Sequence, residues 1–179
     1  MRVLGLDLST NSTGWAILES GDSSPVLKEH GLLTFASVTN TKQSLLLFSS
    51  TLANVINKLK PFDIIVIEDT FVAKNVKTTK ILNRVAGVAI LTSFIHSPQS
   101  QILMIPVMSL RAAKYPKLKL PEAIASKIGY AADKRIDKKI VQRAIMCEYG
   151  LNGIKDDITD AIVAASFPFF GKVQPKWIM

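Results

Sequence analysis

The sequence predicts an α/β domain with a mixed five-stranded sheet, three antiparallel strands followed by two parallel ones, and helices on both faces. Two observations predict it. Strand-like segments joined by short polar turns come first, and helical segments then alternate with short, continuously apolar runs. With 179 residues the chain is long enough for one well-buried core and too short for two ordinary domains. We therefore expect a single domain over residues 1–179.

The first part of the chain predicts an antiparallel meander of three strands. These strands are Val3–Leu8, Gly14–Glu19 and Gly31–Ser37, and clusters of Ser, Asn, Gly and Asp between them mark turns. Asp7 stands out here because an unpaired carboxylate is costly to bury in a strand. It is either a turn residue or a residue held at the strand end to bind a cation or a phosphate.

The rest of the chain alternates between helix and strand. Apolar residues recur at helical spacing up to Leu59, and Pro61 ends that helix. The apolar run FDIIVIED predicts a strand buried on both faces, Thr79–Phe94 a helix, and QILMIPV a fifth strand. Helices over Ile136–Tyr149 and Asp156–Phe167 are the clearest of the remaining segments. This element order is that of a ribonuclease-H-like domain.

Cysteine content and hydropathy indicate a location and exclude some classes of protein. The single cysteine, Cys147, can form no internal disulfide and has no partner at zinc-finger spacing, which suits a reducing compartment. No separate apolar stretch precedes the first strand as a signal peptide would, and no apolar run approaches the length of a membrane span. We expect a soluble, cytoplasmic protein with no membrane partner.

The net charge of +8 is concentrated in one segment. Between Leu110 and Arg143 there are ten basic and three acidic residues. A surplus this large predicts a surface that binds a polyanion such as nucleic acid, although a solvated helical face would also carry such charges.

Four acids stand where apolar residues are expected: Asp7, Glu68, Asp157 and Asp160. The last two, three apart, share one face of a helix whose other side is apolar. In this topology the ends of the first and fourth strands are neighbours, so we expect the four acids to converge. Carboxylates this close are tolerable mainly around hard cations, and two Mg²⁺ ions roughly 4 Å apart can support phosphodiester hydrolysis.

Each acid also has an ordinary interpretation, as a turn cap, a surface residue or a complement to the helix dipole. Spacing alone also leaves the acids of KDDITD open, because Asp156 and Asp160 are helix neighbours at four apart.

The motifs resemble those of the RuvC Holliday-junction resolvases, in order, from about Val3 to Ala165. They are LGLDLSTNSTGWAI, IVIEDTFVAKNVKTTKILNRVAGVAI, KKIVQRAI and DDITDAIVAA, and the second is the most specific. The resemblance implies that Asp7, Glu68, Asp157 and Asp160 are metal-binding catalytic acids and that the Asp-x-x-Asp-Ala pattern selects Asp157 rather than Asp156. It also implies that Lys138 is a catalytic-site lysine and that Phe71 lies at the junction centre.

The resemblance implies that the protein is a homodimer that nicks opposed strands of a four-way or other branched DNA junction with Mg²⁺ or Mn²⁺, two ions per site. A second family lysine falls near Arg111 or Lys114. Together with the charged residues of the motifs and of the basic segment, this predicts a set of DNA-binding residues: Phe71, Lys74, Lys77, Arg111, Lys114, Lys117, Lys119, Lys139 and Arg143. The helix over Thr79–Phe94 is the candidate dimer interface, because its small residues Ala86, Gly87 and Ala89 permit close approach.

The chain departs from the cellular family pattern in two places. The first strand is followed by Asp7-Leu8-Ser9-Thr10 instead of Asp-Pro-Gly-Ser, which changes the turn and keeps the acid. The stretch from Tyr115 to Arg135 is longer than in the cellular enzymes. Both features are similar to those of a phage-type or divergent member.

Two other functions fit parts of the sequence. LGLDLSTNSTG is also similar to the first phosphate motif of sugar kinases and actin-like ATPases, but no Gly-rich candidate for a second phosphate loop is visible. A catalytically inactive module that binds branched DNA is the other alternative, and the complete set of acids argues against it. We expect no small-molecule cofactor.

Overall fold

The computed structural model of the protein describes residues 1–35, 41–69, 76–115, 120–130 and 137–170. Five strands form one sheet in the order β3-β2-β1-β4-β5. They are β1 (Arg2–Leu8), β2 (Ser12–Glu19), β3 (Val26–Thr34), β4 (Ile64–Asp69) and β5 (Gln101–Pro106). β1 pairs antiparallel with β2 and parallel with β4, β2 pairs antiparallel with β3, and β4 pairs parallel with β5. The predicted sheet is confirmed.

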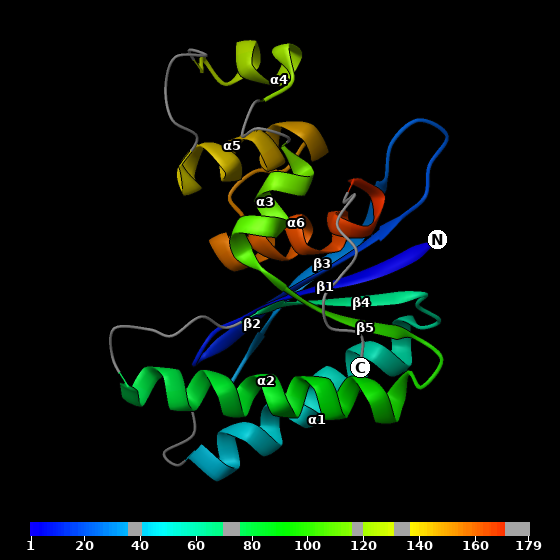
Figure 1. Ribbon diagram of the computed structural model, residues 1–179, viewed down its shortest axis with the longest axis vertical. Helices are drawn as coiled ribbons and strands as arrows, with labels where there is room; N and C mark the ends of the chain where they lie inside the picture. Colours follow the sequence, from blue (N-terminus) through cyan, green and yellow to red (C-terminus); the bar gives the residue numbers. More distant parts are fainter. Residues whose placement is uncertain (36–40, 70–75, 116–119, 131–136, 171–179) are drawn as a thin grey trace.

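Helices cover both faces of the sheet, as predicted (Figure 1). They are α1 (Thr41–Leu59), α2 (Val76–His96), α3 (Val107–Lys114), α4 (Glu122–Lys127), α5 (Lys138–Tyr149) and α6 (Asp156–Phe170). One core lies between the sheet and α1 and α2, and a second lies between the other face and α3, α5 and α6. Because side chains alternate along a strand, Leu4 and Leu6 enter the first core while Val3 enters the second.

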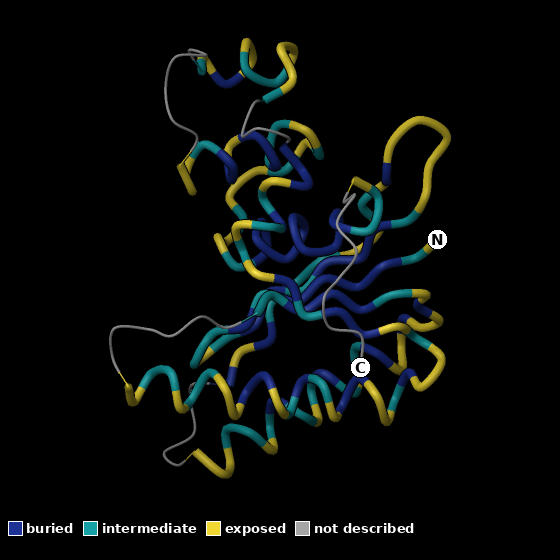
Figure 2. The backbone as a smooth tube through the Cα atoms, viewed as in Figure 1, coloured by how far each residue is buried: buried dark blue, intermediate teal, exposed yellow. Residues whose placement is uncertain are grey.

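Helix α6 lies directly on β1 and β2 because two glycines leave room for its backbone. A Cβ at Gly5 would lie 2.2 Å from the carbonyl oxygen of Ala161, and one at Gly14 would lie 1.9 Å from that of Asp157. Neither distance is possible, so both positions require glycine. The centre of α6 is accordingly among the most buried segments (Figure 2).

The element bounds differ from the predicted ones in two informative places. Strand β3 begins at Val26 and not at Gly31, because its first half lies at the sheet edge and carries exposed Lys28 and Glu29, which hide the apolar alternation. Helix α6 continues through Pro168 to Phe170, where a proline in the last turn removes only one backbone hydrogen bond.

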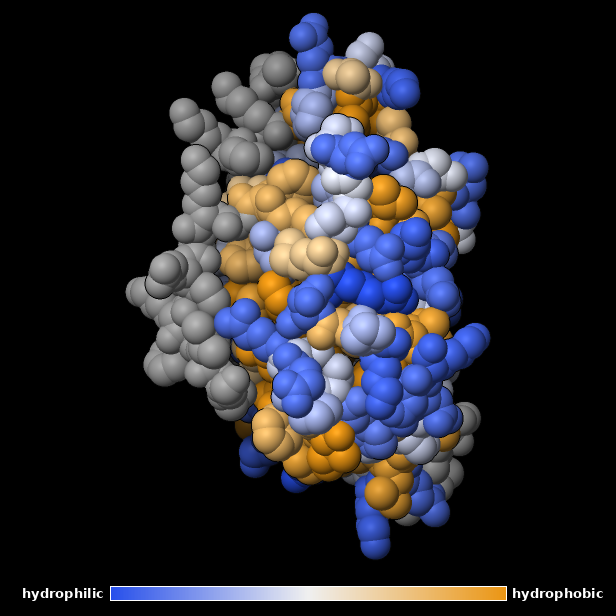
Figure 3. Space-filling model, turned by 90° about the vertical axis from the view of Figure 1, so that its right-hand side faces the viewer, coloured by the Kyte–Doolittle hydropathy of each residue, from blue (hydrophilic) through white to orange (hydrophobic). Residues whose placement is uncertain are grey.

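The surface on the side opposite the carboxyl ends of β1 and β4 carries both hydrophilic and hydrophobic side chains. Figure 3 shows the side of the molecule that is on the right in Figure 1, where the N-terminus lies. Hydrophilic side chains dominate the middle of this surface, and hydrophobic ones form smaller patches above and below (Figure 3). None of the helices in the described part of the chain is both long and apolar enough to span a bilayer.

Candidate active site

Strand alternation places two of the predicted acids on the face of the sheet that α6 covers. Val66 of β4 belongs to the α6 core and Ile67 to the α1–α2 core, so Glu68 faces α6 again. On β1, Leu6 and Leu8 face α1 and α2, which puts Asp7 between them on the α6 side. Leu6 pairs with Ile67 in the neighbouring parallel strand. Asp7 and Glu68 are the next residues of these two strands and therefore lie side by side.

The other two acids come from the first turn of α6. Asp7 pairs across the sheet with Gly14, and the backbone of Asp157 lies directly over Gly14. The glycine therefore brings the start of α6 to the position opposite Asp7. Asp160, one turn further along, is only 5% exposed. Asp156, in contrast, is exposed, which supports the assignment of Asp157 rather than Asp156 to the acidic cluster.

Two cations neutralise Asp160 from different helices. Lys138 Nζ lies 2.7 Å from Asp160 Oδ2, and Arg111 Nη2 lies 3.9 Å from Asp160 Oδ1. Lys138 is the first residue of α5, which begins there because the Asp137 carboxylate accepts a 2.9 Å hydrogen bond from the Ile140 amide as the helix cap. The predicted catalytic lysine thus lies at the acidic cluster, together with Arg111, which was predicted to bind DNA.

Sequence reasoning missed Ser12, which donates a 2.6 Å hydrogen bond from its hydroxyl to Asp157 Oδ2. Ser9 holds Ser12 in place, because its hydroxyl donates to the Ser12 carbonyl and accepts from the Ser12 amide. The signal that could have found this arrangement is the polar turn itself with a glycine inside the following strand, which indicates close approach of another backbone.

Burial and mutual repulsion raise the pKa of two of the acids. The pKa of Asp7 is raised from 3.8 to about 9, first by burial and then by the charges of Glu68, Asp160 and Asp157. The pKa of Glu68 is raised to about 7 by burial and by Asp160. Burial alone would lower the pKa of Lys138, but its hydrogen bond with Asp160 and the surrounding carboxylates raise it. The four acids therefore interact as one cluster.

The oxygen donors suit a hard divalent cation, but the side chains are not arranged around one. Among the residues that the structure describes, no group of three or more His, Cys, Asp and Glu side chains could hold a metal ion as they stand. The Asp160 carboxylate forms ion pairs with Lys138 and Arg111, and the Asp157 carboxylate accepts a hydrogen bond from Ser12. Carboxylates gathered on strand ends with raised pKa values nevertheless fit a divalent ion, because its charge would offset the repulsion that raises them.

Lys114, which was predicted to bind DNA, is buried in the structure. Lys114 is only 7% exposed, and its ammonium group pairs with Glu148. Lys114 Nζ also lies 4.6 Å from the centre of the Phe170 ring. Burial lowers the pKa of Lys114 while Glu148 opposes the shift. The position of Lys114 in the sequence cannot reveal its burial, because the residues that bury it belong to α5 and α6, which are far away in the chain.

The remaining predicted DNA-binding residues lie in different places. Lys77, Lys139 and Arg143 are exposed, and Arg143 donates a hydrogen bond to the carbonyl of Ile128 after α4. Four predicted residues lie outside the described part of the chain: Phe71, Lys74, Lys117 and Lys119.

The sheet order and the carboxylate cluster at its edge define the class of protein, a ribonuclease-H-like domain. The chain matches the family model described as crossover junction endodeoxyribonuclease RuvC over residues 3–165, and it belongs to the RuvC family.

Named relatives and solved structures agree with this assignment. The crossover junction endodeoxyribonuclease RuvC of Caldicellulosiruptor saccharolyticus is 30% identical over 92% of this chain and 90% of its own. The protein of the same name from Finegoldia magna is 28% identical over 96% of this chain and 94% of its own. The structure of Thermus thermophilus RuvC in complex with a Holliday junction substrate has a TM-score of 0.73 at 14% identity, covering 95% of this chain and 93% of that one. That likeness shows the fold.

Proposed function

We propose that this protein is a divalent-metal-dependent endonuclease that nicks opposed strands of four-way or other branched DNA. One observation carries the proposal: Asp7, Glu68, Asp157 and Asp160 come from β1, β4 and α6 to one edge of the sheet in a chain of the RuvC family. Membership of this family favours a nuclease over the ATP-dependent phosphotransferase that the first motif also resembles.

The roles of the site residues follow from their contacts. The four carboxylates would hold Mg²⁺ or Mn²⁺, two ions per site, and the bound ions would supply activation of a water and stabilisation of the leaving oxygen in phosphodiester hydrolysis. Lys138 and Arg111, which pair with Asp160, lie where a positive charge stabilises the negative charge that develops on the scissile phosphate. Ser12 fixes one oxygen of Asp157 and leaves the other for a metal ion.

The decisive experiment incubates the pure protein with labelled four-way junction, fork and linear duplex, with and without Mg²⁺ or Mn²⁺. We expect metal-dependent paired nicks in the branched substrates and none in the duplex. Hydrolysis of ATP without DNA would favour the phosphotransferase. Junction binding without cleavage in any metal would identify an inactive binding module.

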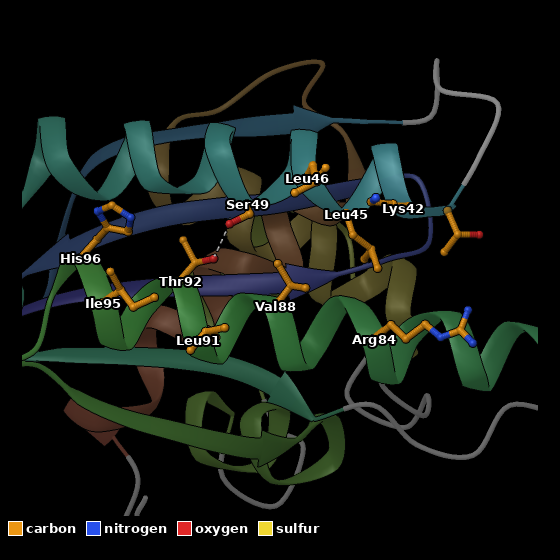
Figure 4. A pocket seen from close by; sticks show the side chains of 11 residues that line it. Lys42, Leu45, Leu46, Ser49, Arg84, Val88, Leu91, Thr92, Ile95 and His96 are labelled. Carbon is orange, nitrogen blue, oxygen red and sulfur yellow. Dashed lines mark hydrogen bonds between the residues drawn. The ribbon is translucent and has the colours of Figure 1, made fainter.

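We also propose that the protein acts as a homodimer, because nicking two opposed strands in concert requires two active sites related by a two-fold axis. A groove of about 610 Å³ runs between α1 and α2, and Figure 4 shows Leu91, Val88 and Leu46 along it, with Ser49 and Thr92 joined by a hydrogen bond. Leu91 is 58% exposed and Phe94 is 62% exposed. Exposed apolar side chains of this size along one helix fit a protein interface.

Gly87 supports the proposal that a second copy of this chain packs on this surface. It lies on the exposed side of α2, and a Cβ there would meet nothing within 4 Å. A glycine inside a helix costs about 1 kcal/mol relative to alanine, and packing within the chain does not require this one. Ala86 and Ala89, which were predicted to face the partner, are buried against the protein's own sheet.

Sedimentation velocity and cruciform cleavage test the dimer. Leu91→Glu with Phe94→Glu should produce a monomer at micromolar concentration that leaves single nicks instead of paired ones. Met108→Glu on α3, which is also an exposed apolar residue, is the control and should stay dimeric. A wild-type monomer with full paired cleavage would contradict the homodimer.

A further inference from the structure

Helices α1 and α2 carry charge of one sign only. Neither helix contains an acidic residue, and together they hold five basic residues: Lys42, Lys58, Lys77, Lys80 and Arg84. Four of the five lie in the first half of their helix, and only Lys58 lies in the last turn of α1. The positive charge of this layer is therefore gathered at one end.

That end lies at the same edge of the sheet as the carboxylate cluster. Helix α2 follows β4, which ends at Glu68 and Asp69, and Figure 1 shows the beginnings of α1 and α2 on the side where the β1–β2 turn lies. Asp7 and the turn residue Thr10 are three residues apart, which is at most about 10 Å of chain. A distance of this order spans only a few phosphates along a DNA strand.

Two adjoining hollows open at this end. One, of about 340 Å³, is lined by four apolar residues, Phe35, Leu45, Ile81 and Val85, and by a set of polar ones: Thr10, Asn11, Thr41, Ser44, Lys77 and Thr78. The other, of about 380 Å³, shares Thr41, Lys77 and Ile81 with the first and adds Val76, Lys80 and Arg84. Hydroxyl, amide and ammonium donors around a hollow suit an anion with several oxygen atoms.

The local charge balance also favours an anion. Asp69 ends β4 on the α1–α2 face of the sheet, and among the described residues at this end it is the one acid on that face, because Asp7 and Glu68 face α6. Four cations therefore stand against one carboxylate there. Lys42 and Arg84 also line the near end of the α1–α2 groove, whose apolar residues Leu91 and Ile95 lie further along α2 (Figure 4).

We propose that this end of the α1–α2 layer is a phosphate-binding subsite for the same DNA that the active site cuts. The subsite holds the backbone of one arm a few phosphates from the scissile bond, on the opposite face of the sheet from the acids. The DNA strand therefore passes over the carboxyl edge of β1 and β4. This proposal rests on the proposed function and adds Lys80 and Arg84 to the DNA contacts already expected at Lys77 and in the basic segment of residues 110–143.

The test compares cations at the two ends of the layer. The variants Lys77→Gln and Lys80→Gln lie at the proposed subsite, and Lys58→Gln, in the last turn of the neighbouring helix α1, is the control. Junction binding is measured from 50 to 200 mM salt in EDTA, which prevents cleavage. Each subsite variant should reduce the log–log salt slope by about 0.9, so that its affinity falls roughly 3-fold less than the wild type's over this range. Lys58→Gln should keep the wild-type slope.

A neutralised phosphate shows whether the contact is local. Methylphosphonates are placed one at a time within about five phosphates of the nick, and the effect of Lys80→Gln should disappear at one of these positions. Equal slopes for Lys77→Gln, Lys80→Gln and Lys58→Gln would overturn the subsite, as would an effect that no single methylphosphonate removes. A wild-type protein that binds no branched DNA would instead overturn the proposed function.

Discussion

The two faces of the sheet differ in how they treat charge. On the α6 face, Asp160 is buried and pairs with two cations, Lys138 and Arg111. On the α1–α2 face the helices carry no acid, and their basic residues stand mainly at one end. On the proposed function, the difference teaches that one sheet edge separates two tasks: we infer that the α6 face supplies the chemistry and that the α1–α2 face supplies surface for a partner copy and for DNA.

Loss of the Asp7 carboxylate should have the largest effect, because it should abolish cleavage while DNA binding remains. Asp7→Asn would remove a proposed metal ligand, and the loss of several kcal/mol of transition-state stabilisation corresponds to a rate loss of about 10³-fold or more. Junction binding should survive or tighten, because repulsion of the phosphate falls. Single-turnover cleavage and gel-shift titration measure the two quantities. Equal losses of binding and cleavage would contradict the assignment of Asp7 to chemistry.

The register of α6 can be tested with neighbouring acids. Asp157→Asn should reduce cleavage by about 10²-fold, because Asp157 points to Ser12 and the cluster. Asp156→Asn is the control and should keep most activity, since Asp156 is exposed. The reverse order would show that the assignment is one residue wrong.

Neighbouring lysines at the start of α5 separate chemistry from affinity. Lys138→Ala should slow cleavage of bound junction by about 10²-fold with little change in affinity, because its charge lies at Asp160. Lys139→Ala should show the opposite pattern, with weaker binding and a nearly normal rate. The comparison uses single-turnover rates at saturating DNA, and equal effects of the two substitutions would remove the special role of Lys138.

A smaller effect is expected from the β1–β2 turn. Ser12→Ala should raise the Mg²⁺ concentration needed for half-maximal rate by about 10-fold, because Asp157 loses the hydrogen bond that orients it. Ser12→Thr, which keeps the hydroxyl, should restore the wild-type value. Ser20→Ala, a hydroxyl loss at the other end of β2, is the control. An unchanged metal dependence in Ser12→Ala would mean that the bond is structural only.

The smallest effect concerns stability without metal. The folded pKa of Asp7 is raised to about 9 from 3.8, so the folded protein binds a proton that the unfolded chain releases between these values. Stability in EDTA should therefore fall as the pH rises from about 4 to about 9. Asp7→Asn should flatten this dependence and raise the melting temperature at pH 8, by about 2–4 °C for each kcal/mol gained. Parallel melting curves for the two proteins across this pH range would contradict the raised pKa.

The element order, both layers of helices and the edge at which the acids meet could be predicted from the sequence. Apolar periodicity and strand alternation are local properties, and Asp7 and Glu68 each follow an apolar strand whose place in the sheet the element order predicts. The Asp-x-x-Asp spacing also placed Asp157 and Asp160 on one side of a helix before any packing was known.

Packing between distant segments decided the rest. Asp156 and Asp157 are equivalent by helix spacing, and the contact of α6 with Gly14 and Ser12 distinguishes them. Lys114 and Lys138 are both lysines of one basic segment, yet one is buried beside Glu148 and the other reaches Asp160. The sequence by itself determines which side chains can carry charge and how they follow one another along an element. Whether a charge meets solvent, a partner or an acid depends on residues far away in the chain, because desolvation and Coulomb forces act through space.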